Sequence, residues 1–119
     1  MGSSNSGAKP LTSSVFYILL ALADKDRHGL GISEEVARRT EGDVDMGPGT
    51  LYNALRKMWA DGLIEESDER GDPDEDDPRR RYYRITGAGR QAVSVEAVRL
   101  ERVLVAAREK DLLPSLRRP

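Results

Sequence analysis

Residues 47–58 read GPGTLYNALRKM, and this stretch decides the fold that we expect. Pro48 suits the first position of a helix, where its missing N–H group would have no helical partner in any case. Apolar residues follow at steps of four and three, the spacing of a buried helical stripe: Leu51, Leu55 and Met58. Gly62 then provides the left-handed residue that commonly ends a helix. We therefore predict a short helix over about residues 48–61, with one face buried and the other open to a partner.

The segments after this helix are typical of a β-hairpin. Residues 63–66 form a short arm that begins with two apolar side chains, and residues 79–85 carry aromatic and β-branched side chains. If Ile85 points inward, strand alternation points Tyr83 inward and turns Tyr82 outward. The intervening residues are rich in Gly, Pro and Asp, which is typical of a turn. A helix followed directly by a hairpin is the core of a winged helix-turn-helix.

Two more helices are expected before this unit. Residues 15–23 are almost wholly apolar. A buried strand would fit this run by periodicity alone, but its length and its Leu and Ala content favour a central helix capped by Thr12 or Ser13. Residues 29–40 suit a second helix, with Ile32 and Val36 directed inward. Its charged residues are expected to face solvent, namely Glu34, Glu35, Arg38 and Arg39.

A last helix is expected from about Gly87 to Lys110, with Thr86 as its cap. An apolar seam follows it at steps of four, three, four and three residues: Val93, Ala97, Leu100, Leu104 and Ala107. A helix of about 24 residues is roughly 36 Å long, so the small core would cover only its first turns. We expect a homodimer in which this seam and the first helix hold a second copy. Packing of the seam on its own subunit is the alternative.

The composition excludes several classes of protein. The chain has 119 residues, 38% hydrophobic and 34% charged, which suits one soluble domain. It contains no cysteine, which excludes disulfides and suits a cytoplasmic location. His28 is the only histidine, so neither a zinc site nor a Cys–His pair can be assembled, and we expect no metal, no cofactor and no enzyme activity. No run approaches the roughly 20 apolar residues of a membrane span.

The charge distribution limits where nucleic acid could bind. The net charge is −2, but residues 63–78 hold 9 acidic side chains and 1 basic side chain, so the rest of the chain is basic. Asn53 can pair with adenine and Arg56 with guanine, each for roughly 1–3 kcal/mol of discrimination. The expected DNA contacts are Thr50, Tyr52, Asn53, Arg56 and Lys57 on the helix and Arg79, Arg80 and Arg81 on the hairpin. A dimer would bind double-stranded DNA at an inverted repeat. The alternative is a protein-interaction module whose acidic wing docks on a basic partner.

Several short motifs stand in a characteristic order: FYIL at 16–19, HG at 28–29, GTLY at 49–52, GLI at 62–64 and RYYRIT at 81–86. In this order the chain resembles the PadR family of transcriptional regulators, in its short form with one C-terminal helix, over about residues 11–110. The resemblance implies a winged-helix homodimer that represses transcription. It also implies that small phenolic or other hydrophobic molecules relieve repression in some members, and we expect any such effector near the dimer interface.

Two features depart from the family pattern, namely a longer and more acidic wing tip and the glycine at position 87. The expected fold is mostly α with a small β-hairpin: a winged helix-turn-helix plus a long C-terminal helix. We expect a DNA-binding domain at residues 11–86 and a dimerisation helix at 87–113. Residues 1–10 are expected to be a disordered N-terminus or an expression remnant, and residues 114–119 a tail.

Overall fold

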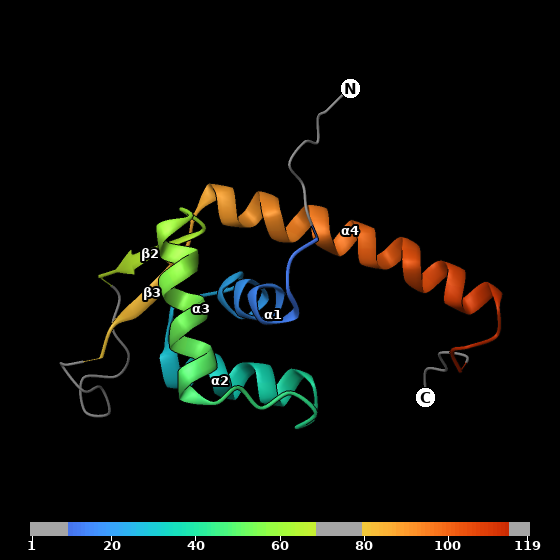
Figure 1. The fold of residues 1–119 in the computed structure, drawn as a ribbon, viewed down its shortest axis with the longest axis horizontal. Helices are drawn as coiled ribbons and strands as arrows, with labels where there is room; N and C mark the ends of the chain where they lie inside the picture. The colour runs from blue at the N-terminus through green and yellow to red at the C-terminus, as the bar shows by residue number, and fades with distance from the viewer. Residues whose placement is uncertain (1–9, 69–79, 115–119) are drawn as a thin grey trace.

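The computed structural model describes residues 10–68 and 80–114. These residues form four helices and one small sheet. The elements are α1 (Ser13–Leu22), β1 (Arg27–His28), α2 (Gly29–Arg39), α3 (Pro48–Ala60), β2 (Ile64–Ser67), β3 (Tyr82–Ile85) and α4 (Gly87–Glu109). Figure 1 shows α1 at the centre, with α2 and α3 around it, the sheet at one end and α4 along one side. This arrangement confirms the predicted winged helix-turn-helix with a long C-terminal helix.

The helices begin and end where their capping residues predict. The Thr12 side chain accepts a hydrogen bond from the Val15 amide at 3.2 Å, and Thr86 accepts one from the Gly89 amide at 3.1 Å. Gly62 ends α3 with a φ of 79°, and the amide that follows it bonds back to the Met58 carbonyl at 2.9 Å. Such capping depends only on neighbouring residues, which is why the sequence predicted it.

The hydrophobic core lies between α1 and the elements that surround it. α1 contributes more core side chains than any other element, and α3 contributes the predicted stripe. The buried residues of these two helices are Ile18, Leu19, Ala21, Leu22, Leu51, Leu55 and Met58. Side chains from α2, the sheet and the first turns of α4 complete the core. Burial of this stripe fixes which side of α3 faces outward.

The sheet is antiparallel with the order β1–β3–β2, so the hairpin has a third strand that the sequence analysis did not predict. β1 lies in the segment expected to be a polar break. Arg27 pairs with Tyr83, and His28 pairs with Tyr82. The prediction that Tyr82 faces outward is wrong, because β1 and the His28 ring cover it. The two rings meet edge to face with centroids 5.1 Å apart, and Tyr82 is buried.

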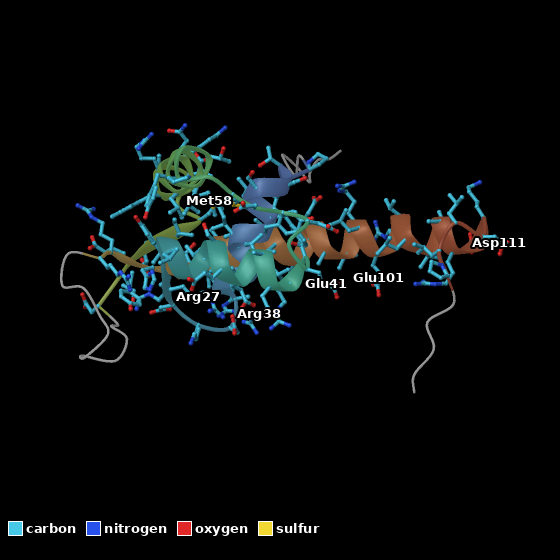
Figure 2. All side chains as sticks on the ribbon, turned by 90° about the horizontal axis from the view of Figure 1, so that it is seen from below. Arg27, Arg38, Glu41, Met58, Glu101 and Asp111 are labelled. Atoms are coloured by element: carbon cyan, nitrogen blue, oxygen red, sulfur yellow. The ribbon has the colours of Figure 1, made fainter. Side chains whose placement is uncertain are left out.

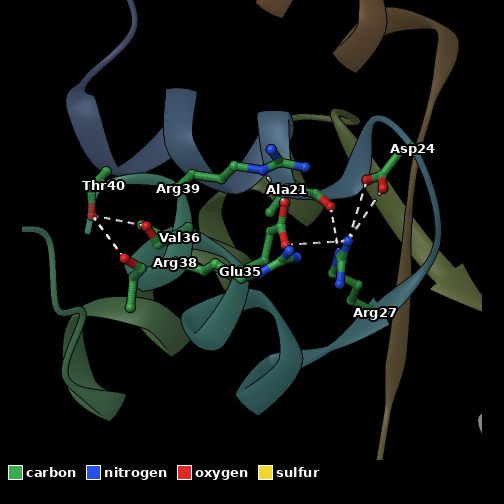
Figure 3. A network of polar contacts seen from close by, with 9 residues as sticks. Ala21, Asp24, Arg27, Glu35, Val36, Arg38, Arg39 and Thr40 are labelled. Atoms are coloured by element: carbon green, nitrogen blue, oxygen red, sulfur yellow. Dashed lines mark hydrogen bonds and ion pairs between the residues drawn. The ribbon is translucent and has the colours of Figure 1, made fainter. Parts of the chain in front are cut away.

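The prediction that Glu35 faces solvent is also wrong. Its side chain is only 5% exposed and lies among three arginines, Arg27, Arg38 and Arg39 (Figure 3). Arg39 Nε donates to Glu35 Oε2 at 2.8 Å, Arg38 bonds the other oxygen, and Arg27 Nη2 lies 3.6 Å from it. A carboxylate with this many cationic donors can be buried, whereas an unpaired one could not.

The wing is described only in part. β3 is shorter than the predicted arm because it begins at Tyr82, and β2 (Ile64–Ser67) lies one residue later than predicted. Residues 69–79 hold most of the acidic run and also Arg79, and they lie outside the described residues.

Candidate nucleic-acid interface

The outer face of α3 carries every residue expected to contact DNA from that helix. Leu51, Leu55 and Met58 turn inward, which leaves the polar side chains on the solvent side. The exposed residues are Thr50, Tyr52, Asn53, Arg56 and Lys57. The first turn before them is open as well, because nothing lies within 4 Å of a Cβ built on Gly47 or Gly49. A helix with a slim, exposed first turn can approach the floor of a major groove closely.

Two of the expected base-reading side chains contact each other on this face. The Arg56 guanidinium donates to the Asn53 side-chain oxygen, one helical turn away. Both side chains therefore already lie side by side. Either one can turn to a base edge when a duplex replaces the contact between them.

Tyr52 packs against α2 while staying partly open. Its side chain is 45% exposed, and a Cβ built on Gly29 would lie 2.4 Å from the Tyr52 hydroxyl oxygen. Glycine at position 29 therefore allows the phenol to lie against the start of α2. The Tyr52 ring therefore packs against the neighbouring helix, and its hydroxyl is a group that can donate a hydrogen bond to a phosphate.

The described wing arginines lie beside this tyrosine. Arg81 is exposed and Arg80 is partly buried, with its Nη1 atom 3.2 Å from His28 Nε2. Both line a cavity of about 310 Å³ together with Tyr52 and the start of α2. The fold thus brings the hairpin arginines next to α3, although about 25 residues separate them in sequence.

His28 has a role that the sequence analysis did not assign. Its Nδ1 atom accepts a hydrogen bond from the Gly31 amide at 3.1 Å, so His28 is the N-cap of α2. A polar residue directly before an amphipathic run is a capping signal that could have predicted this role.

Trp59 lies at the outer edge of α3, next to the sheet. Its ring meets the Tyr83 ring edge to face, with centroids 6.2 Å apart, and its side chain stays 39% exposed. Burial raises the pKa of the Tyr83 hydroxyl, so this phenol stays neutral over the physiological range. The two rings line a second cavity of about 270 Å³ with Arg56 and Arg81.

The expected dimerisation residues divide into two groups along α4. Val93 is buried against the core of its own chain, whereas Ala97 and Leu104 are exposed. Leu100 and Ala107 are partly exposed. Figure 2 shows the helix extending past the other elements between Glu101 and Asp111. The first turns of the seam therefore pack within the chain, and the later turns do not.

Other kinds of site find no support in residues 10–68 and 80–114. No group of three or more His, Cys, Asp or Glu side chains lies there in a position to hold a metal ion. Over the same residues, no helix combines the length and the apolar content that a membrane crossing requires.

Comparison with known proteins gives a consistent result. Residues 18–95 match the model of the transcriptional regulator PadR-like family. Transcriptional regulator Rv3488 of Mycobacterium tuberculosis is 38% identical over 85 residues, which cover 71% of this chain and 73% of that protein. A PadR family transcription regulator from Clostridium difficile has a similar fold, with a TM-score of 0.67 at 20% identity over 82% of this chain and 97% of that one.

A further neighbour extends this comparison. RosR of H. salinarum has a similar fold, with a TM-score of 0.60 at 27% identity over 89% of this chain and 99% of that chain. The family model, the sequence relative and the similar folds all point to transcriptional regulators. The family consists of regulators rather than enzymes. The chain belongs to the PadR-like family of transcriptional regulators.

Proposed function

We propose that this regulator is a homodimeric, sequence-specific DNA-binding repressor that reads an inverted repeat. The observation that carries the proposal is the outer face of α3, where Thr50, Asn53 and Lys57 are exposed above a fully buried stripe. Side chains of these types recognise phosphates and base edges in a major groove. The wing arginines Arg80 and Arg81 flank the same face.

The proposed dimer rests on α4. Its later turns carry large apolar side chains that stay about half exposed among the described residues, including Leu104 at 48% exposure and Val103 at 53%. A helix exposed in this way is usually buried against a partner. Two copies joined along α4 and α1 would present two α3 helices, and such pairs bind half-sites about one helical turn apart.

The proposed effector is a small hydrophobic molecule that relieves repression. A cavity of about 420 Å³ between α1 and α2 supports this part of the proposal, because its wall includes Tyr17, Leu20 and Val36. That volume falls within the usual range for small-molecule sites. Leu20 is half exposed on the helix that we assign to the dimer interface, so an effector there would lie close to both subunits.

The test begins with selection of bound sequences from a random pool of duplexes. We expect an inverted repeat, and duplex affinity that falls steeply as salt rises. Replacing Arg56 and Lys57 together by alanine should weaken binding to the selected site at least tenfold, because base and phosphate contacts are both lost.

The matched control replaces Lys25 and Arg102 by alanine. It removes the same two charges from exposed positions away from α3 and should leave affinity nearly unchanged. Equal loss in both variants would contradict the assignment of the reading face. Failure of the wild-type chain to bind any duplex at low salt would instead favour the protein-docking alternative.

A further inference from the structure

Asn53 and Arg56 form one hydrogen-bonded pair on the exposed face of α3. They stand three positions apart, which places both side chains on the same side of the helix. The Arg56 Nη2 group donates to the Asn53 Oδ1 atom, and both side chains are exposed. Because a guanidinium has only donors, the amide atom that faces it must be the oxygen. The NH2 group of Asn53 therefore points away from Arg56 and keeps its hydrogens for another partner.

No carboxylate competes for Arg56 among the described residues. Over residues 10–68 and 80–114, the arginines that pair with carboxylates are Arg27, Arg38, Arg39, Arg84 and Arg99. Arg56 lines a cavity of about 270 Å³ together with Arg81, and the described lining of this cavity holds no acidic side chain. The Asn53 oxygen is therefore the acceptor that orients Arg56 before DNA binds.

The pair offers hydrogen-bond donors and covers the acceptor that lies between them. Asn53 presents the N–H groups of its amide, and Arg56 has further N–H groups besides the one that it gives to Oδ1. The Asn53 oxygen keeps a second lone pair, but the positive guanidinium beside it repels the hydrogens of an amino group. An unpaired asparagine differs, since it offers one acceptor and one donor side by side. The hydrogen bond thus changes what Asn53 can recognise.

The base edges in the major groove differ in the same respect. Guanine presents two acceptors, N7 and O6, whereas adenine presents the N7 acceptor and an amino group. An unpaired asparagine fits adenine with two hydrogen bonds, which is the contact that the sequence predicts for Asn53. The pair of Asn53 and Arg56 fits guanine instead, because both of its outward groups donate.

We propose that Asn53 and Arg56 stay paired on DNA and together read one guanine, so that Arg56 sets the base preference of Asn53. This inference rests on the proposed function and deepens it, because it names the base that the centre of α3 reads. The Asn53 amide donates to one acceptor of the guanine edge, and the Arg56 guanidinium donates to the other. Separate reading of two bases would cost the charge-assisted hydrogen bond between the two side chains. Joint reading keeps that bond and still uses the outward donors.

The test compares three variants by selection of bound sequences from a random duplex pool: Asn53→Ala, Arg56→Met and Lys57→Met. Asn53→Ala identifies the base pair that Asn53 reads, because the preference at that position is lost. We expect guanine at this position for the wild-type chain. For Arg56→Met we expect adenine at the same position, because methionine donates no hydrogen bond and the amide regains its acceptor.

Lys57→Met is the matched control. Lys57 is the next residue along α3, is exposed and carries the same charge, but it makes no hydrogen bond to Asn53 in the described part of the chain. The variant should weaken binding to every duplex and leave guanine preferred, because a phosphate contact carries no base information. Circular dichroism first checks that the three variants, all at exposed positions, keep the wild-type fold.

Two duplexes that differ only at this base pair give the size of the effect. The wild-type chain should bind the guanine duplex about tenfold more tightly than the adenine duplex, and Arg56→Met should reverse the order. On the guanine duplex, the losses caused by Asn53→Ala and Arg56→Met should not add in the double variant, because the two side chains act as a unit.

The inference is overturned if the wild-type chain selects any base other than guanine at this position, or if Arg56→Met keeps guanine or loses all preference there. It is also overturned if Asn53→Ala leaves every preference unchanged, or if the two losses add as independent contacts would. An inverted repeat selected together with any of these results refutes the pair alone and leaves the proposed function intact. A wild-type chain that binds no duplex at low salt refutes both.

Discussion

At the scale of single residues, Glu35 is the side chain on which the packing of the helices depends most, because its buried carboxylate binds arginines from two elements. It gathers arginines from β1 and from the end of α2, and Arg27 also donates to the Ala21 carbonyl of α1 at 2.8 Å (Figure 3). The cluster therefore links α1, α2 and the sheet. Within the cluster, Glu35 and Arg27 are the shielded groups, so removing the Glu35 charge leaves the Arg27 guanidinium with less compensation.

Glu35→Gln should lower the free energy of unfolding by about 2 kcal/mol, less than for a fully enclosed pair because Arg38 and Arg39 are largely exposed. Urea unfolding measures the change. Glu34→Gln is the control, because Glu34 precedes it on the same helix and is exposed. A loss of equal size in both variants would contradict the role given to the cluster.

The same carboxylate makes stability depend on pH. The hydrogen bond from Arg39, helped by the charges of Arg27 and Arg38, holds the pKa of Glu35 below its ordinary value. A lowered folded-state pKa contributes stability that is complete above the unfolded-state pKa of about 4.3 and is lost as pH falls through the folded-state pKa. The stability gap between the wild-type chain and Glu35→Gln should therefore narrow below about pH 4. A difference in stability that stays constant down to pH 3 would contradict the assigned role of the ionised Glu35 carboxylate.

At the scale of elements, the crossing of α4 over the start of β2 depends on one glycine. A Cβ built on Gly89 would lie 2.2 Å from the Leu63 carbonyl oxygen, which is backbone and cannot move aside. Thr86 strengthens the same junction, since its hydroxyl donates to the Gly62 carbonyl at 2.6 Å and accepts from the Gly89 amide. The direction in which α4 leaves the domain is therefore set within its first turn.

Gly89→Ala should destabilise the fold by about 1–3 kcal/mol, although alanine is the better helix former by about 1 kcal/mol. Gly87→Ala is the matched control, because nothing lies within 4 Å of a Cβ at that position. It should be neutral or slightly stabilising. Thermal unfolding compares the two variants, and a stable Gly89→Ala protein would show that α4 does not approach β2 so closely.

At the scale of the whole molecule, α4 is longer than the core that supports it. Its first turns bury Gly89, Val93 and Glu96, whereas the apolar residues of its later turns remain exposed in the single chain (Figure 1). A short core cannot cover a helix of 23 residues. A second copy is therefore the proposed cover, and the proposed inverted repeat follows from the symmetry of that pair.

Leu104→Glu together with Leu100→Glu should give monomers that bind the selected duplex weakly, since a charge on each seam would be buried in the dimer. Light scattering measures the mass. Arg102→Gln is the control for Leu104→Glu, because it changes the charge by the same amount on the opposite side of the helix. A double variant that stays dimeric would contradict the seam.

Local patterns in the sequence were enough to predict the four helices, the caps Thr12 and Thr86, and the exposed face of α3. Helical periodicity and capping depend on residues a few positions apart, so Pro48, Thr86 and Gly62 act in any context that lets the helices form. The exposed side chains on α3 follow directly from the buried stripe beneath them.

Only the tertiary structure decided the third strand, the burial of Tyr82 and Glu35, and the position of the hairpin arginines beside α3. Each depends on residues far apart in the chain: β1 pairs with β3, and Arg81 lies beside Tyr52. A carboxylate is buried only where several cations converge, and a strand of two residues forms only beside a partner with free backbone groups. Such contacts have no local periodicity, because the folded core, and not the neighbouring sequence, brings these groups together.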